Sequence, residues 1–210
     1  KTSRDMGDMA EGGSLFGAAA LLDKLREAFA KDGTALHESE AILDELKVVM
    51  LRFSALPPAI PATPTSTQKN ELLVAREALE FGALLAVRKS EINQFERHIA
   101  QLKTYYSDCA SLLTESSRQY PLLGLNLLRL LAQNRIAEFH TELEQLPAEQ
   151  LHTNAYIKFP AQLEQHIMEG SYNRVLAANQ GGFYKQEGMY FMDMLVDTVR
   201  DAIATCSEKA

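Results

Sequence analysis

Residues 134–147 read NRIAEFHTELEQLP, and residues 90–102 read SEINQFERHIAQL. In both stretches a short polar turn leads into apolar residues at the spacing i, i+3, i+7 and i+10, and the two copies lie 44 residues apart. A helix, a polar turn and a helix repeated at this period predict stacked helical hairpins, because one hairpin cannot bury both of its faces. The spacing is also generic for amphipathic helices, so coincidence is the alternative. The matching positions are Ile92, Phe95, Ile99 and Leu102, then Ile136, Phe139, Leu143 and Leu146, and in a fainter third copy Tyr172 and Val175.

The rest of the chain has the same helical period. Apolar stripes run through residues 15–30, 42–53 and 72–86, and no stretch alternates apolar and polar residues over the length of a strand. We therefore predict an all-α fold, a right-handed array of TPR-like antiparallel helix pairs with nine or ten helices. The helix expected over 187–209 has a wide apolar face and no glycine or proline after it, so we expect it to be cut mid-course in a longer natural protein.

Prolines and glycines predict the division of the chain. Residues 1–13 are polar and mixed, which favours a disordered lead-in, and residues 14–56 predict an N-terminal helical pair. Four of the seven prolines lie in the Pro-rich linker 57–67, which is either a connector or a recognition ligand. Residues 68–210 form the helical-repeat domain. We expect further breaks at Pro121, Pro147, Pro160 and Gly181-Gly182, and an N-cap at Ser90.

Composition limits the classes of partner. The chain has 21 basic and 28 acidic residues, a net charge of −7, and residues 136–210 alone hold 5 basic and 11 acidic ones. Nucleic acid and anionic membranes are therefore poor partners. No run of about 18 apolar residues predicts a transmembrane helix, and no secretory signal is visible. Cys109 and Cys206 lie far apart, which predicts no disulfide framework and fits a reducing compartment.

Sequence motifs for catalysis are missing. The chain has no phosphate-binding loop, no HExxH and no CxxC. Its one Glu-x-x-His, Glu149 with His152, places two ligands on one helical face, but a di-iron bundle needs two such motifs and two further glutamates. We therefore predict that the protein is not an enzyme and has no catalytic or metal-binding residue, no cofactor and no small-molecule substrate. A helical metallohydrolase built on this pair is the alternative.

Histidines and aromatic residues are interpreted by their helical setting. The histidines outside the Glu-x-x-His motif lie near acidic residues in amphipathic stretches, which favours surface or boundary positions. The paired aromatics either pack between helices or anchor a partner. Ser116-Ser117 favours helix-start chemistry. The histidines are His37, His98, His140 and His166, and the aromatics are Tyr105, Tyr106, Tyr156 and Phe159.

Longer strings carry a family resemblance. Residues 121–147 read PLLGLNLLRLLAQNRIAEFHTELEQLP, residues 95–106 read FERHIAQLKTYY, and residues 154–175 contain NAYIKFP and LEQHIMEGSYNRV. With residues 191–208, they closely resemble the smallest helical-repeat subunit of the proteasome regulatory-particle lid. This family is called non-ATPase regulatory subunit 8 in animals and subunit 12 in yeast. The likeness begins near Leu21 and leaves out the Pro-rich linker.

The resemblance implies a PCI protein, in which helical repeats precede a winged helix. The chain ends where the winged helix would begin, so residues 68–210 would run into the N-terminal part of the PCI domain. The implied role is a structural scaffold that supports lid assembly, lid–base joining and ubiquitin-dependent degradation in cytoplasm and nucleus. The implied partners are other lid subunits, the base scaffold subunit and the ubiquitin-receptor subunit. A scaffold role in the COP9 signalosome or translation initiation factor three is the alternative.

Overall fold

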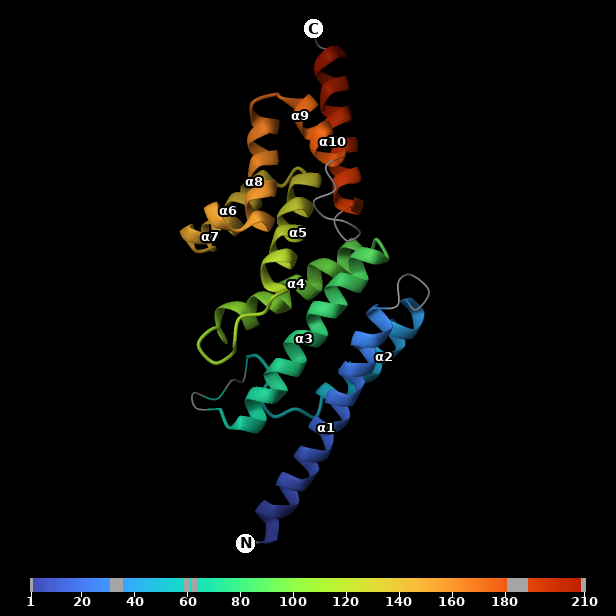
Figure 1. Ribbon diagram of the computed structural model, residues 1–210, viewed down its shortest axis with the longest axis vertical. Coiled ribbons are helices and arrows are strands. Elements are labelled where there is room, and N and C mark those ends of the chain that lie inside the picture. The colour runs from blue at the N-terminus through green and yellow to red at the C-terminus, as the bar shows by residue number, and fades with distance from the viewer. Residues whose placement is uncertain (1, 31–35, 59–60, 62–63, 181–188, 209–210) are drawn as a thin grey trace. The chain divides into compact units, whose positions relative to one another are not determined.

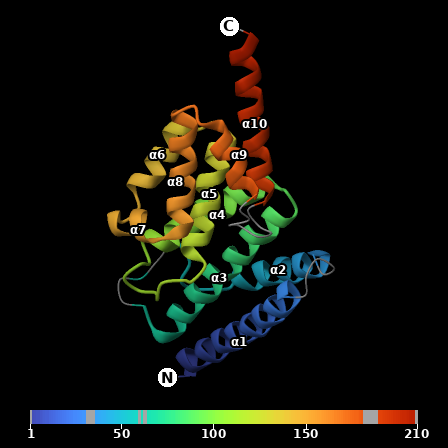
Figure 2. The ribbon, with the colours of Figure 1, turned by 45° about the horizontal axis from the view of Figure 1, so that its top comes forward.

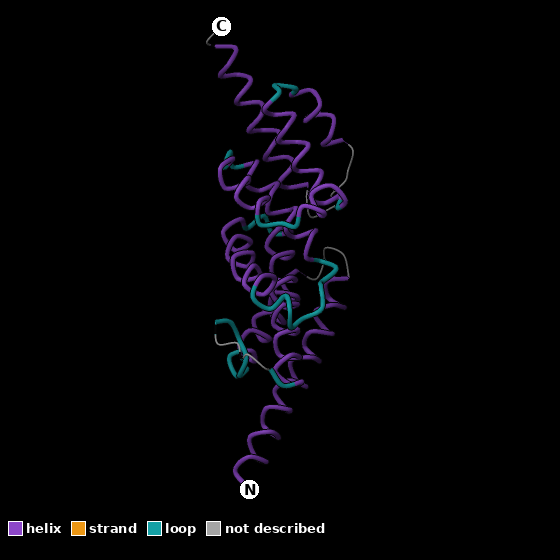
Figure 3. The backbone as a smooth tube through the Cα atoms, turned by 90° about the vertical axis from the view of Figure 1, so that its left-hand side faces the viewer, coloured by secondary structure: helices purple, strands orange, loops and turns teal. Residues whose placement is uncertain are grey.

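A computed structural model of the chain describes residues 2–30, 36–58, 61, 64–180 and 189–208, with 2–14, 179–180 and 201–208 described by their backbone alone. Within these ranges every regular element is a helix and no strand occurs (Figure 3), so the all-α prediction is confirmed. No helix in the described part is both long and apolar enough to cross a membrane. The ten helices are α1 (Thr2–Ala30), α2 (Leu36–Met50), α3 (Ser66–Arg88), α4 (Ile92–Ser107), α5 (Gln119–Ala132), α6 (Ile136–Glu144), α7 (Ala148–Thr153), α8 (Ala155–Met168), α9 (Tyr172–Gln180) and α10 (Met189–Glu208).

The chain divides into two compact units. Unit 1 consists of residues 1–86 and 93–115, and unit 2 consists of residues 87–92 and 116–210. Most of α1 to α4 therefore belongs to unit 1, whereas α5 to α10 belong to unit 2. This division falls inside the stretch 68–210, for which the sequence predicts one helical-repeat domain.

Unit 1 is built on a core shared by α1, α2 and α3. Helices α1 and α2 pack side by side (Figures 1 and 2). The ring of Phe29 on α1 meets that of Phe81 on α3 edge-on, with centroids 5.2 Å apart. Arg26 on α1 binds Glu77 on α3 through two contacts, Nε to Oε1 at 2.9 Å and Nη2 to Oε2 at 2.6 Å. The buried core residues are Ala18, Leu22, Leu25, Leu43, Leu46, Phe53, Val74, Ala78, Phe81 and Leu85.

A buried carboxylate holds the chain where it leaves α2. Glu71 on α3 is only 2% exposed. Its Oε2 accepts hydrogen bonds from the backbone N–H of Ser54 at 3.1 Å, the hydroxyl of Ser54 at 3.2 Å and the backbone N–H of Ala55 at 3.2 Å. Hydrogen bonds from backbone N–H groups to an ionised carboxylate are stronger than neutral ones. Glu71 therefore fixes the path by which the chain enters the stretch ahead of α3.

Helix α5 forms the centre of unit 2. Ten of its fourteen residues are buried, and it packs against α6, α8 and α10 (Figure 1). Its run of leucines has no polar face because neighbours cover it on several sides. At its C-terminal end, Thr198 Oγ1 of α10 donates a 2.8 Å hydrogen bond to the carbonyl oxygen of Ala132. Helices α7 and α9 pack against α8, and α9 also packs against α10.

The three repeat copies share one backbone turn. Ser90, Asn134 and Gly170 have φ angles of 60°, 55° and 69°, in the left-handed region. In each copy the next helix begins two residues later, and the residue five positions after the turn is fully buried. This shared geometry favours a structural repeat over coincidence between amphipathic helices. The helices begin at Ile92, Ile136 and Tyr172, and the buried residues are Phe95, Phe139 and Val175.

Two of these turns have the hydrogen-bond pattern of a Schellman motif. The N–H of Asn134 donates to the carbonyl of Leu131 at 2.9 Å, and the N–H of Arg135 donates to the carbonyl of Leu130 at 2.9 Å. At Gly170 the corresponding bonds run to Ile167 at 3.0 Å and from Ser171 to His166 at 2.8 Å. These bonds satisfy carbonyls at the helix end and fix the direction in which the chain leaves it.

Three expectations about local structure are wrong. Ser90 is not the N-cap of α4, since its positive φ makes it the terminating residue of α3. Pro160 lies inside α8 instead of breaking it. Its ring is buried on the same face as Ile157 and Leu163. This burial offsets the loss of the backbone hydrogen bond that proline cannot donate. Residues 2–13 belong to α1 instead of a disordered lead-in, although the three glycines and two aspartates among them are weak helix formers. The break expected at Gly181-Gly182 lies outside the described residues.

Removing the carboxylate of Glu71 should destabilise unit 1. Glu71→Ala leaves the backbone N–H groups of Ser54 and Ala55 without their acceptor, so we expect a loss of about 2–3 kcal/mol in the free energy of unfolding. Urea denaturation at pH 7 measures this loss. Glu45→Ala, at an exposed position of α2, is the matched control and should change stability by less than about 0.5 kcal/mol. Equal effects of the two substitutions would contradict this role.

Alanine substitutions at two glycines should have opposite signs. An added Cβ would meet nothing within 4 Å at either Gly170 or Gly17, so only the backbone distinguishes them. Gly170→Ala should cost about 1 kcal/mol because its φ is +69°. Gly17→Ala, inside α1, should stabilise by up to about 1 kcal/mol. Thermal unfolding measures both, and a stabilising Gly170→Ala would refute the left-handed assignment.

Candidate functional site

The carboxylate and histidine of the Glu-x-x-His motif lie on a short exposed helix. Glu149 and His152 both belong to α7, which has six residues, and both are exposed. Within the described part of the chain, no group of three or more His, Cys, Asp or Glu side chains gathers as a metal site would require. The two residues are therefore not joined there by the further ligands that a di-iron bundle needs.

One histidine is buried, contrary to expectation. His37 and His140 are exposed, and His166 is partly buried, which agrees with the surface or boundary positions predicted. His98 on α4 is only 8% exposed. The ring fits there because residue 82 of α3 is glycine, and a Cβ at that position would lie 3.0 Å from the ring. Its place between Phe95 and Ile99 on the apolar stripe is the signal that could have revealed it.

Burial makes the His98 side chain neutral at physiological pH. Desolvation, together with the smaller effect of the positive charge of Lys47, lowers the pKa of His98 to about 4. The Nδ1 atom is buried and has no hydrogen-bond partner among the described residues. Buried polar atoms without a hydrogen-bond partner are uncommon in folded proteins. Nδ1 of His98 is therefore a polar atom that the described part of unit 1 does not satisfy.

The aromatic pairs divide between packing and exposure. Tyr105 is buried, and burial raises its pKa to about 12. The hydroxyl of Tyr106 donates a 3.0 Å hydrogen bond to Oε1 of the buried Glu80. These two residues therefore pack within unit 1. Phe159 is partly buried, whereas Tyr156 is exposed at the surface of unit 2.

The surroundings of Cys109 and Ser116 are defined by burial and by local hydrogen bonding. Cys109 is buried and free, and burial raises the pKa of its thiol, which disfavours the reactive thiolate. The side chain of Cys206 lies outside the described residues. The hydroxyl of Ser116 accepts a 3.2 Å hydrogen bond from the backbone N–H of Arg118 just before α5, but Arg118 itself is the N-cap of α5, so neither serine caps this helix.

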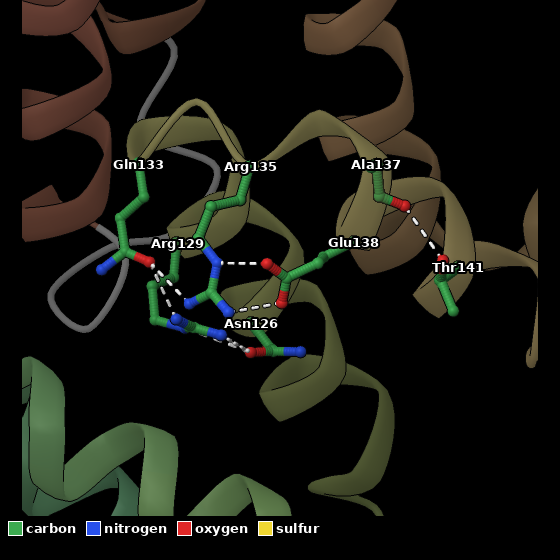
Figure 4. A network of polar contacts seen from close by, with 7 residues as sticks. All are labelled: Asn126, Arg129, Gln133, Arg135, Ala137, Glu138 and Thr141. Carbon is green, nitrogen blue, oxygen red and sulfur yellow. Dashed lines mark hydrogen bonds and ion pairs between the residues drawn. The ribbon is translucent and has the colours of Figure 1, made fainter.

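A polar network joins the end of α5 to the start of α6 (Figure 4). The guanidinium of Arg129, which is buried, donates to Oδ1 of Asn126 at 3.2 and 2.9 Å and to Oε1 of Gln133 at 2.9 Å. Arg135 donates to the same Gln133 oxygen at 3.3 Å and binds the carboxylate of Glu138 through two contacts. Because these bonds span the Asn134 turn, the network holds the repeat geometry.

Unit 1 has an apolar groove between α1 and α3, here named the α1–α3 groove. Its volume is about 600 Å³. Phe16 is exposed at the groove, and its charged residues are balanced, with two bases and two acids. Its lining residues are Leu15, Phe16, Ala19, Leu22, Asp23, Arg26, Asn70, Leu73, Val74, Arg76 and Glu77.

A second hollow of unit 1, the α2–α4 pocket, has a different charge. Its volume is about 380 Å³, and its ionisable lining residues within the described ranges are Lys47, Arg97 and His98, with no carboxylate among them. Leu51, which is 81% exposed, lies in its wall. Sequence reasoning missed this site because its residues come from separate helices and show no shared spacing. The remaining lining residues are Met50, Leu56, Leu79, Gln94 and Gln101.

Helical architecture and sequence comparison together define the class of protein. Residues 117–210, which include all of α5 to α10, match the model of the CSN8/PSMD8/EIF3K family. Together with the repeated helix–turn–helix geometry, this match defines an all-α helical-repeat protein of the PCI type.

Individual relatives narrow the class further. The chain is 44% identical over 188 residues to the Arabidopsis thaliana 26S proteasome non-ATPase regulatory subunit 8 homolog A, covering 90% of this chain and 68% of the relative. It is 33% identical over 189 residues to the Caenorhabditis elegans 26S proteasome non-ATPase regulatory subunit 8, covering 89% and 69%. It is 40% identical over 147 residues to the Schizosaccharomyces pombe 26S proteasome regulatory subunit rpn12, covering 70% and 53%. The chain belongs to the 26S proteasome non-ATPase regulatory subunit 8 family.

Acid should destabilise unit 1 through His98. Its pKa is near 6.5 in the unfolded chain and about 4 in the folded one, so the unfolded chain binds the proton first. Stability therefore falls as pH drops from about 7 towards 4.5, by about 2–3 kcal/mol from this residue.

Urea denaturation between pH 4.5 and 7.5 tests this dependence. The His98→Gln variant should have a flatter dependence of the free energy of unfolding on pH than the natural chain. The variant His37→Gln removes an exposed histidine and should reproduce the natural slope. Parallel curves for the natural chain and His98→Gln would show that His98 is not buried as a neutral ring.

Proposed function

We propose that this protein is a structural scaffold subunit in the lid of the proteasome regulatory particle, which supports lid assembly, lid–base joining and ubiquitin-dependent protein degradation. The observation that carries the proposal is the 44% identity to the plant regulatory subunit across 90% of the chain. Two further relatives with proteasome-subunit names, from worm and fission yeast, support it. The protein acts by packing against its neighbours, not by catalysis.

Exposed apolar side chains in both units support a role in protein contacts. Large hydrophobic residues at a surface are expected where subunits meet, and a specific interface buries about 800 Å² on each partner. In unit 1 such residues lie on α1 and at the end of α2, and in unit 2 they lie on α8 and α10. They are Phe16, Val48, Leu51, Tyr156, Met168 and Met189.

The proposed partners are other lid subunits, the scaffold subunit of the base and the ubiquitin-receptor subunit. The proposed locations are the cytoplasm and the nucleus. The net charge of −7 argues for protein partners over nucleic acid or anionic membrane, because a phosphate-binding surface needs an excess of positive charge.

A scaffold role in the COP9 signalosome or translation initiation factor three is the second candidate. The matching family model, CSN8/PSMD8/EIF3K, covers all three groups in one description, and this shared description favours the second candidate. The model covers residues 117–210 only, whereas the relatives with proteasome names align with most of the chain. The longer alignments favour the proteasome.

Purification of the tagged protein from its own cells tests the two candidates. We expect lid and base subunits of the 26S proteasome to be recovered in equal amounts with the protein, and the particle to degrade ubiquitin conjugates in the presence of ATP. Mass spectrometry and a native gel measure this, with an untagged strain as control. Recovery of signalosome or initiation-factor subunits instead would overturn the proposal.

A further inference from the structure

The α2–α4 pocket combines an apolar wall with positive charge in a protein that is acidic overall. Among the described residues, Lys47 and Arg97 are the charged side chains of its lining and no carboxylate lines it, although the chain carries a net charge of −7. The α1–α3 groove is different, since Asp23 and Glu77 line it beside its two arginines. The α2–α4 pocket is thus a local exception to the charge of the chain.

The positive groups of this pocket are available for binding. Among the described residues, Arg97 is exposed and has no ion pair. Within the described part of the chain, Lys47 has one ion pair, with Asp44 on its own helix at 3.0 Å. An exposed i,i+3 pair of this kind contributes little to stability, and the ammonium group can make further hydrogen bonds. An incoming carboxylate would therefore meet two cations with little competition.

The apolar part of the pocket is also incompletely covered. Leu51 is 81% exposed, and Met50 and Leu56 beside it are only partly buried, whereas Leu79 lies buried beneath. Covering exposed apolar surface is favourable at about 25 cal/mol per Å². At about 380 Å³, the pocket is within the size range of ligand sites.

His98 supplies a second, independent observation. Its imidazole belongs to the pocket wall, is more than nine-tenths buried, and has an Nδ1 atom without a partner among the described residues. A buried polar atom without a partner costs free energy. The wall of the pocket therefore includes a polar side chain that the described part of the fold leaves unsatisfied.

We propose that the α2–α4 pocket binds a short acidic segment of a partner protein, with one large apolar side chain against Leu51 and flanking carboxylates on Lys47 and Arg97. A protein segment fits better than RNA, because the apolar wall suits an aliphatic or aromatic side chain and the acidic chain repels a polyanion. This proposal deepens the proposed scaffold function by giving the chemistry of one partner surface.

Fluorescence anisotropy with three labelled peptides tests the proposal on the 210-residue chain. The peptide GDEELFDEDG should bind. The peptide GNQQLFNQNG, which lacks carboxylates, and the peptide GDEEGSDEDG, which lacks the apolar pair, should each bind at least tenfold more weakly. Equal binding of all three peptides, absence of binding by the first, or equal displacement by an RNA oligonucleotide would overturn the proposal.

Variants locate the binding. Lys47→Ala and Arg97→Ala should each raise the Kd for GDEELFDEDG about tenfold, and Leu51→Ser should also weaken binding. Lys24→Ala removes the same charge at an exposed position of α1 outside the pocket and should leave Kd unchanged. Circular dichroism melts check that each variant is folded, and Arg97→Gln replaces Arg97→Ala if that variant is unstable. Equal Kd values for the natural chain and the pocket variants would contradict the site.

The peptide assay and the purification assay can fail separately. The peptide assay contains no proteasome subunit, so a negative result refutes the pocket and leaves lid membership standing. Recovery of a different complex in the purification refutes lid membership, while peptide binding that depends on Lys47 would still define an acidic-segment site.

Discussion

The geometry of the repeats depends on one constraint, a single left-handed residue that ends a helix five positions before a buried side chain. Ser90, Asn134 and Gly170 each occupy this position. The turn leaves only one residue between itself and the next helix, so the first buried side chain of that helix is placed by the backbone and not by a flexible loop. Phe139 and Val175 are consequently fully buried, although the sequences around them differ.

Around the central turn, packing and polar bonding reinforce each other. Helix α5 supplies a leucine-rich surface to three neighbours, which leaves little room for a charge. Arg129 is nevertheless buried there, and side-chain oxygens of Asn126 and Gln133 accept its N–H groups. A buried guanidinium is costly unless its donors are satisfied. The same Gln133 oxygen also accepts from Arg135, so the bonds that make Arg129 tolerable also hold the turn.

The sequence predicts the helical class and the three turns because both depend on local patterns of two to four residues. Prediction from the sequence fails where tertiary packing decides the environment of a residue. The burial of His98 depends on the missing side chain of Gly82 on another helix, and the tolerance of α8 for Pro160 depends on burial of the ring. The N-cap prediction for Ser90 is wrong for a local reason. Serine is a preferred N-cap residue, whereas the backbone at position 90 needs a residue that ends a helix. The α2–α4 pocket could not be predicted, because it exists only once three helices are packed.

Buried charged groups and charged groups at the surface of this protein differ in their bonding, and this difference connects the fold to a scaffold role. The carboxylate of Glu71 and the guanidinium of Arg129 are both held by bonds to groups of their own unit, so they stabilise the fold and offer little to a partner. Lys47 and Arg97 instead line a pocket that has no acidic residue in the described part of the chain, beside an apolar side chain that is largely exposed. Positive charge next to an exposed leucine is the pattern expected where a second protein completes the surface.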